Sequence, residues 1–394
     1  MLYLTLFIGL AGAFYLQDKM KAAKLYTIFL TILAAFRYGI GADYFAYEFL
    51  YKQLKPFVIP EILFGTEKQE VGFRALGSFI KTFGLSYQTY VAILAAITLY
   101  YIYRICVRYS KNPMLSMVIY YAFFYFVWVY SGLRQGLAMS VGAFYLLEAL
   151  RSDTIEKRKE FYKASILLLT IHTSSIIFMV FYVLVRFIPW NRKWMMLTIA
   201  ASILFAFIPL GNLVEMLSEK IPFLLRLSYY LDDAFTLKEL FSIQVLARLG
   251  LLSIVLYYYN ELSLVSPMMK KIADVYLLSF VFYFLLQFSE LTAARIAVYG
   301  RLMEIIIFTR IVYLRRPKLE GTVFLLGLLL LTSFYFVKEV ETMKEQSGLI
   351  ILDKEWVPYI SVFTKEEQYY NTYFYYIMHY VGKDPTPRNY HMRE

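Results

Sequence analysis

Apolar stretches long enough to cross a membrane recur along almost the whole chain. A transmembrane helix needs roughly 20 mostly apolar residues to cover the hydrocarbon core of a bilayer. Since a backbone in lipid must satisfy its own hydrogen bonds, the spanning segments are expected to be α-helices. The pattern predicts an all-α, polytopic integral membrane protein with about ten transmembrane helices, near residues 2–16, 22–38, 88–106, 113–130, 132–150, 194–211, 242–259, 273–289, 298–314 and 322–337.

One further apolar segment, residues 164–185, has two interpretations. It carries no Lys, Arg, Asp or Glu and could cross the membrane once. A single crossing would place the basic residues at 270–271 and 315–318 outside, against the positive-inside rule. Its middle, residues 172–175, reads His-Thr-Ser-Ser, and polar backbone at membrane depth is tolerated where protein covers it or water fills a cavity. We therefore favour a broken, re-entrant hairpin that returns to the side it entered.

Basic residues gather in alternate loops and indicate which side each loop faces. The net charge is +11 and only 18% of the 394 residues are charged, against about a quarter in soluble domains. Cytoplasmic loops carry an excess of Lys and Arg, and basic groups fall near residues 19–24, 104–111, 151–163, 270–271 and 315–318. The regions near 37–87, 212–241 and 290–298 and the tail 338–394 are then external. The absence of repeats and of low-complexity linkers favours a single domain over residues 1–394.

The residue types present narrow the chemistry. The single cysteine, Cys106, cannot form an internal disulfide, and the chain has three histidines, at 172, 379 and 391. No metal site and no cofactor are expected from this set. The basic groups fit the loop pattern of a membrane protein, so no nucleic-acid partner is expected.

The first external region contains polar residues where a span ends. Arg37 follows the second apolar run, and Asp43 opens a stretch rich in aromatic residues that includes Tyr44. We expect one short amphipathic helix after Asp43 and a second over residues 70–83, where apolar residues recur at helical spacing. Asp43 and Glu70 are either solvated loop carboxylates or members of a site.

Arg134 is the most informative single residue of the chain. No other Lys, Arg, Asp or Glu occurs between residues 112 and 147. An arginine at the head of an apolar helix is costly, so it is expected to be a snorkelling anchor, an ion-pair partner or a functional group. Gly132 and Gly136 bracket it and would let another group approach the backbone closely, and Gln135 adds a second polar side chain.

The third external region adds Arg295, Tyr299 and Arg301. Glu304 lies three residues after Arg301, so an ion pair within one helix is one interpretation of that arginine, and Arg295 could be an ordinary interfacial arginine. His172 is either a hydrogen-bonded core histidine or part of a cavity lining. Together the outer side offers several arginines, which bind phosphate and pyrophosphate bidentately, and aromatic faces that suit sugar rings.

Several segments, in this order, resemble the EpsG-type branch of the Wzy polysaccharide polymerases: FRYGIGADYFAYEFLY, EVGFRALGSFIKTFGLSYQTYVAIL, SGLRQGLAMSVGAFYL, IHTSSIIF, ARIAVYGR and WVPYI. The resemblance implies a membrane glycosyltransferase with a GT-C-like core in the bacterial inner membrane. Such an enzyme joins repeat units carried on undecaprenyl pyrophosphate at the outer face. The matching positions are Arg37, Gly39, Asp43, Tyr44, Glu70, Gly72, Arg134, Gln135, Gly136, His172, Arg295, Tyr299, Pro358 and Tyr359.

The resemblance suggests roles for these residues. Arg134 and Arg295 are expected to neutralise the departing pyrophosphate, and Arg37 to lie near a second lipid carrier. Asp43, Glu70 and His172 compete, in that order of preference, for the base that deprotonates an acceptor hydroxyl. One base without a covalent partner implies inversion at the anomeric carbon.

Three alternatives share parts of this pattern. A ligase that transfers finished glycan would have a similar site and a different acceptor. A flippase or other transporter of lipid-linked oligosaccharide usually has repeated halves, and no repeat is evident here. A membrane O-acyltransferase would need a catalytic histidine in a recognisable setting. Besides lipid-linked oligosaccharides and membrane lipid, a chain-length regulator and a flippase are expected partners.

Overall fold

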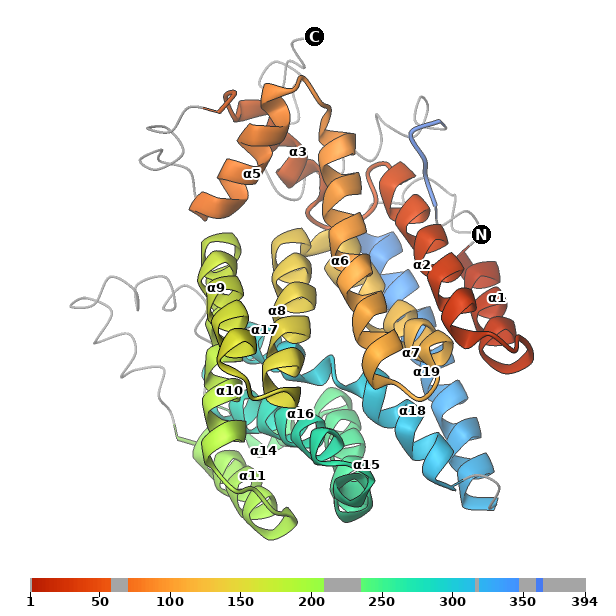
Figure 1. The fold of residues 1–394 in the computed structure, drawn as a ribbon, viewed down its shortest axis with the longest axis vertical. Coiled ribbons are helices and arrows are strands. Elements are labelled where there is room, and N and C mark those ends of the chain that lie inside the picture. The colour runs from red at the N-terminus through yellow and green to blue at the C-terminus, as the bar shows by residue number, and fades with distance from the viewer. Residues whose placement is uncertain (1, 58–69, 209–234, 316–318, 347–358, 364–394) are drawn as a thin grey trace, which may run out of the picture. The chain divides into compact units, whose positions relative to one another are not determined.

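The computed structural model describes residues 2–57, 70–208, 235–315, 319–346 and 359–363. These residues are helical apart from their connections and one isolated bridge between Arg37 and Ser361. The all-α prediction is confirmed (Figure 1). The helices are α1 (Leu2–Tyr15), α2 (Lys19–Phe36), α3 (Tyr44–Gln53), α5 (Val71–Thr82), α6 (Tyr87–Tyr109), α7 (Pro113–Tyr120), η1 (Tyr121–Ser131), α8 (Leu133–Arg151), α9 (Ile155–Ile171), η2 (Thr173–Ile176), α10 (Ile177–Phe187), α11 (Arg192–Ala206), α14 (Leu237–Leu240), α15 (Ile243–Val265), α16 (Pro267–Leu285), α17 (Glu290–Arg301), α18 (Glu304–Arg315) and α19 (Leu319–Gln346).

Three described helices are long and apolar enough to cross a membrane, judged by length and composition. They are Tyr87–Tyr109, Pro113–Ser131 and Leu319–Glu345, and Leu2–Tyr15 and Thr173–Phe187 are shorter apolar helices. These segments support a membrane protein, whereas the predicted total of about ten spans stays a prediction.

The chain divides into two compact units. The first comprises residues 1–141, 170–172 and 322–394, and the second comprises residues 142–169 and 173–321. In the first unit, α2 packs on α6 and α7, and α1 packs on α7 (Figure 1). Buried tyrosines of η1 tie these helices together, because Tyr121 donates a hydrogen bond to the carbonyl of Leu2 and Tyr125 to that of Leu30.

The junction between η1 and α8 explains the glycines beside Arg134. η1 is a π-helix, and π-helical segments are rare in proteins and occur frequently at functional sites. A Cβ atom at Gly136 would lie 1.8 Å from the backbone carbonyl oxygen of Trp128, and one at Gly132 would lie 2.9 Å from the Trp128 ring. The group that approaches these glycines is therefore the preceding turn of the chain itself. This close approach fixes where α8 begins and so where Arg134 lies.

The break and return predicted for residues 164–185 are confirmed. α9 ends at Ile171, a 3₁₀ turn follows at Thr173–Ile176, and α10 begins at Ile177. The two helices run back along each other, since the rings of Phe161 and Tyr182 lie 4.9 Å apart and Arg186 pairs with Asp153. Both ends of the hairpin therefore lie together.

Three helix boundaries differ from the predicted segments. The span predicted over 298–314 is divided, because α17 ends at Arg301 and α18 begins at Glu304, where these two side chains form an ion pair. The region 290–298, expected as a loop, is helical, and Ser289 caps it by accepting a hydrogen bond from the Thr292 amide. α19 continues to Gln346, well past residue 338, because Val340 and Met343 are still buried.

The structure describes some of the other regions predicted to be external and not others. The two short helices expected in the region 37–87 are confirmed as α3 and α5. Of the region 212–241, residues 212–234 lie outside the described residues, and α14 occupies the end of it. Pro358 and most of the tail also lie outside the described residues. Which side of the membrane each region faces, and the single-domain organisation, stay predictions.

Candidate functional site

Arg134, Glu70 and His172 come together in the first unit. The Arg134 guanidinium donates through Nη1 to Glu70 Oε2 and through Nε to the Tyr47 hydroxyl at 3.2 Å. Its charge also lies 5.8 Å from the centre of the Tyr47 ring. Nη2 makes no hydrogen bond to any residue that the structure describes. The arginine is thus paired and keeps one edge for a ligand.

The second oxygen of Glu70 holds His172. Glu70 Oε1 lies 3.3 Å from His172 Nδ1, so a proton on Nδ1 donates to the carboxylate. His172 Nε2 is buried without a hydrogen-bond partner in the described part of the chain. A carboxylate that orients a histidine through one ring nitrogen is a feature of general-base arrangements.

Local packing brings Glu70 to His172. Glu70 is the residue that precedes α5, yet its side chain does not cap that helix. A Cβ atom at Gly72 would lie 2.1 Å from Thr170 Oγ1, so only glycine lets the start of α5 approach the end of α9 this closely. Glu70 therefore stands at the start of α5 without a capping hydrogen bond, and its carboxylate turns to Arg134 and His172 instead.

The charge of Glu70 is fixed by these neighbours. Burial acts to raise its pKa, but the hydrogen bond with His172 and the positive charge of Arg134 outweigh burial and lower the pKa to about 2. Such a carboxylate is a weak base at neutral pH, because a general base works best with a pKa near the working pH. Glu70 is suited to orient the histidine, and His172 is the better candidate for the base.

The low pKa of Glu70 predicts an acid-dependent loss of stability. The unfolded chain takes up this proton near the ordinary value of 4.5, the folded chain only near 2. The stabilisation, roughly 3 kcal/mol at most, is complete above pH 4.5 and is lost as the pH falls toward 2. We expect thermal unfolding of the purified protein in detergent to shift more steeply between pH 5 and pH 3 in the native protein than in Glu70→Gln. Equal slopes would show that the carboxylate is not held in this way.

Arg37 lies away from this cluster and is fully buried. Its guanidinium donates to the carbonyls of Ala34, Ile40 and Tyr130, at 2.7, 3.2 and 3.0 Å. The Tyr130 ring lies 4.6 Å from its charge. The role expected for Arg37 beside a lipid headgroup needs an accessible guanidinium, and the burial and these partners favour a structural role instead.

Replacing Arg37 should therefore affect folding rather than substrate binding. We expect Arg37→Ala to lower stability by at least ~3 kcal/mol, since it removes three charge-assisted hydrogen bonds and leaves buried carbonyls unpaired. The measurement is thermal unfolding in detergent together with the yield of folded protein, with the exposed Arg108→Ala as the matched control. Normal yield and stability of the Arg37 variant would contradict the structural role.

Two candidate residues near Arg37 in the chain, Tyr44 and Asp43, lie in a packed part of the structure. Tyr44 is buried, and its hydroxyl donates to Gln88 Oε1 at 2.7 Å. Asp43 precedes α3 without capping it and is half-buried. Gly41 has a φ of 111°, and a Cβ atom there would lie 2.5 Å from the Tyr130 carbonyl oxygen. This turn is therefore tightly packed.

The remaining candidates do not share one arrangement. Gln135, the residue after Arg134 in the chain, is buried. In the second unit, Arg301 pairs with the buried Glu304, with Nε–Oε1 at 2.9 Å, which confirms the ion-pair interpretation. Tyr299 is buried and its hydroxyl lies 2.9 Å from Ser174 Oγ. Arg295 is exposed on α17. The substrate contacts expected of Arg295, Tyr299 and Arg301 stay predictions.

The sequence suggested Tyr47 only as one of the aromatic faces after Asp43, and its contact with Arg134 was not predicted. Tyr44, Tyr47 and Tyr51 recur at the spacing of one helix face, and all three are buried. That spacing was the available signal, because residues three and four apart share a face. No group of three or more His, Cys, Asp and Glu that could hold a metal ion occurs within the described segments.

The comparison with protein families decides what kind of chain this is. The model of the EpsG family matches residues 24–361. The chain belongs to the EpsG family. No curated protein and no solved structure matches it. Glu70, Arg134 and His172 all lie within the residues that the EpsG family model matches, and membership of this family suggests a role of the chain in polysaccharide biosynthesis.

Proposed function

We propose that the protein is a polysaccharide polymerase that joins oligosaccharide repeat units carried on undecaprenyl pyrophosphate. The reaction takes place at the outer face of the bacterial plasma membrane, on a core of GT-C type. The observation that carries the proposal is the cluster of Glu70, Arg134 and His172 in a chain of the EpsG family. It combines an oriented base with a positive charge, and these are the two groups that glycosyl transfer from a pyrophosphate requires.

Each residue of the cluster has one task. His172 Nε2 takes the proton of an acceptor sugar hydroxyl, and the acceptor oxygen forms a bond to the anomeric carbon of the donor. The bond from that carbon to the pyrophosphate oxygen breaks, and undecaprenyl pyrophosphate leaves. Arg134 offers Nη2 to the charge that develops on the leaving group, and Glu70 holds the histidine in one tautomer. A single displacement of this kind inverts the anomeric carbon.

This scheme reverses the order of candidate bases. His172 comes first because its Nε2 has no partner in the segments described. Glu70 becomes a positioning residue, and Asp43 belongs to the packed turn near Arg37. The proposed arginine is Arg134, since Arg37 is occupied by backbone carbonyls.

The orientation in the membrane can be tested with introduced cysteines. Loop charges predict that Thr66 and Tyr230 are external and Glu156 is cytoplasmic. We expect cysteines at positions 66 and 230 to react with a membrane-impermeant maleimide in cells with a permeabilised outer layer, and position 156 to be protected. The native Cys106 is buried and gives little background. Labelling at 156 with protection at 66 and 230 would invert the proposed orientation.

The proposed function itself is tested by deleting the gene and analysing surface glycan on gels. A polymerase deletion should collapse the ladder of chain lengths to a single repeat unit, and the intact gene should restore it. Loss of all glycan would instead indicate a ligase or a flippase.

A further inference from the structure

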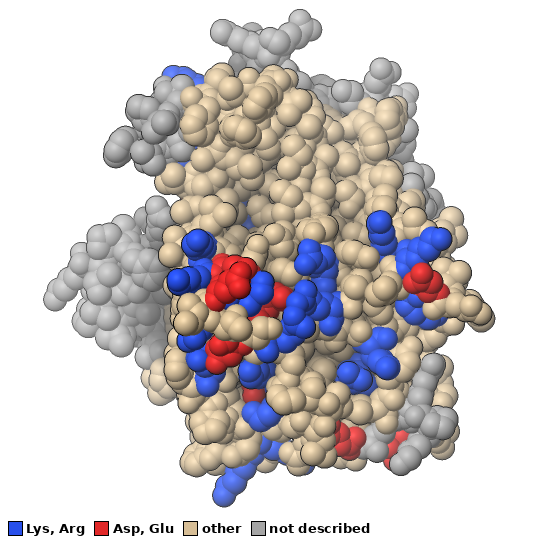
Figure 2. Space-filling view, viewed as in Figure 1, with Lys and Arg blue, Asp and Glu red and all other residues tan. Residues whose placement is uncertain are grey.

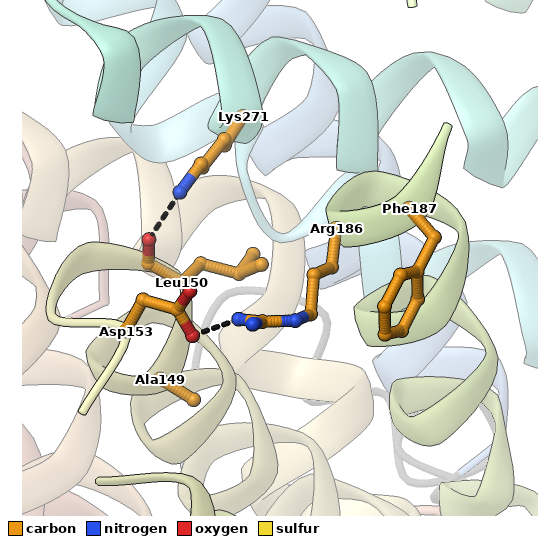
Figure 3. Close-up of a pocket in the computed structure, with 6 residues that line it drawn as sticks. All are labelled: Ala149, Leu150, Asp153, Arg186, Phe187 and Lys271. Carbon is orange, nitrogen blue, oxygen red and sulfur yellow. Dashed lines mark hydrogen bonds and ion pairs between the residues drawn. The ribbon is translucent and has the colours of Figure 1, made fainter. Parts of the chain in front are cut away.

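Two cavities of the second unit share Arg186 and Phe187. The first, of about 210 Å³, is lined by Ala149, Leu150, Asp153 and Lys271 besides those two (Figure 3). The second, of about 410 Å³, adds Ile155, Arg158, Lys159, Tyr162 and Tyr182. Both lie where the α9–α10 hairpin begins and ends. They contain none of the residues of the Glu70–Arg134–His172 cluster.

Positive charge exceeds negative charge in these cavities. Arg158, Lys159, Arg186 and Lys271 line them, against the single carboxylate of Asp153. Asp153 accepts from Arg186, and Arg158 Nε lies 3.7 Å from the same oxygen. Figure 3 shows Arg186 and Lys271 reaching into the first cavity from different helices, Lys271 toward the Leu150 carbonyl at 2.6 Å. One acid cannot balance four cations, so the cavities favour an anion.

Two further observations indicate the same preference. Burial and the positive charges of Arg186 and Lys270 lower the pKa of Lys271, and a bound anion would relieve this repulsion. Arg158 Nε is buried and, among the described residues, donates no hydrogen bond. On the face drawn in Figure 2, basic and acidic side chains are intermixed, so the excess of positive charge is a property of the cavity lining and not of the whole face.

Apolar surface lies directly beside these charges. The side chains of Phe187 and Ile155 are 67% and 65% exposed, although both line the cavities. Arg186 lies over the rings of Phe187 and Tyr182, at 5.4 and 5.9 Å. A small hydrophilic anion would leave this apolar rim in contact with water, whereas the acyl chains of a lipid would cover it.

We propose that the two cavities form a binding site for the phosphate of an anionic phospholipid such as phosphatidylglycerol. The basic loops around residues 151–163 and 270–271 are those that the charge pattern assigns to the cytoplasmic side, where anionic lipid headgroups bind basic pockets between helices. Arg158 and Arg186 suit bidentate contact with phosphate oxygens, and Lys271 adds a point charge. The site does not depend on the proposed polymerase reaction.

The test uses the purified full-length protein in a neutral detergent. Thermal unfolding is followed while dioctanoyl-phosphatidylglycerol, dioctanoyl-phosphatidylcholine or inorganic phosphate is added at constant ionic strength. The variants are Arg186→Gln, Arg158→Gln and Lys271→Gln. For each variant the ligand-induced shift is measured from its own ligand-free unfolding midpoint, so that a change in basal stability does not affect the comparison. Lys193→Gln, an exposed lysine of α11 that lines neither cavity, is the matched control.

We expect phosphatidylglycerol to raise the unfolding midpoint and phosphatidylcholine to raise it much less. The apparent affinity should fall roughly tenfold or more in each of the three variants, which is the factor expected for one charge-assisted hydrogen bond, and stay unchanged in Lys193→Gln. Equal midpoint shifts with both lipids, or unchanged affinity in all three variants, would overturn the site. A full shift with inorganic phosphate alone would overturn the lipid as its ligand.

Discussion

Replacement of His172 by alanine should reduce polymer yield per unit of membrane protein by about 10²–10⁴-fold, the usual contribution of a general base. The structure motivates this because His172 Nδ1 faces Glu70 Oε1 and Nε2 is left for the substrate. His172→Gln should be similarly inactive, since glutamine can keep a hydrogen bond to Glu70 but cannot take a proton. Yield is measured as repeat units polymerised in a strain that lacks the native gene, with the protein quantified in membranes.

Two controls separate catalysis from folding. His391→Ala changes a histidine outside the residues that the family model matches and should be silent. Asp43→Asn should reduce the yield far less than His172→Ala, because Asp43 lies in the packed turn near Arg37. Wild-type yield from His172→Ala at normal expression would remove the base from the proposed reaction.

Replacement of Arg134 should have the second large effect. Arg134→Ala removes both the charge and the fork, and the yield should fall about 10²–10³-fold, as found when one preorganised group that stabilises a transition state is lost. Arg134→Lys keeps a positive charge but loses the planar guanidinium fork, so its yield should lie between those of the native protein and of Arg134→Ala. The protein should still insert, since Arg134 is partly exposed and an alanine at the head of α8 is compatible with the helix.

The Arg134 result needs a test for indirect effects through Glu70. Removing the arginine leaves the Glu70 carboxylate without one of its two partners, and this change can displace His172. The double variant Arg134→Ala/Glu70→Gln is therefore compared with Glu70→Gln alone: equal yields would show an indirect role of Arg134, and a further fall in the double variant a direct one. Arg108→Ala, an exposed arginine of α6, is the matched control and should be silent. Full activity of Arg134→Ala would leave this residue as an anchor only.

Much of the fold follows from local patterns in the sequence. Helical spacing predicts α3 and α5, and four polar residues in an apolar run predict the turn between α9 and α10. The break between α17 and α18 was missed because hydropathy averages over a window of residues and does not register the short turn between Arg301 and Glu304.

The sequence predicted which residues were candidates for the site, but not which of them lie in contact. Glu70, Arg134 and His172 were each candidates, but Glu70 is 64 residues from Arg134 and 102 from His172 in the chain. No local pattern connects them, because the connection comes from packing such as that of Gly72 against Thr170. The same reason explains why the burial of Arg37 was not predicted, since its partner carbonyl at Tyr130 lies 93 residues away.

The central claim is that this chain itself joins lipid-linked repeat units. It is tested most directly with the purified full-length protein in proteoliposomes, supplied with a repeat unit on undecaprenyl pyrophosphate isolated from a strain without the polymerase gene. The account predicts one undecaprenyl pyrophosphate released for each new linkage, and a rate at least about 10²-fold lower with His172→Ala. Absence of any linkage with folded, membrane-inserted protein, or equal rates for the native protein and the His172 variant, would contradict it.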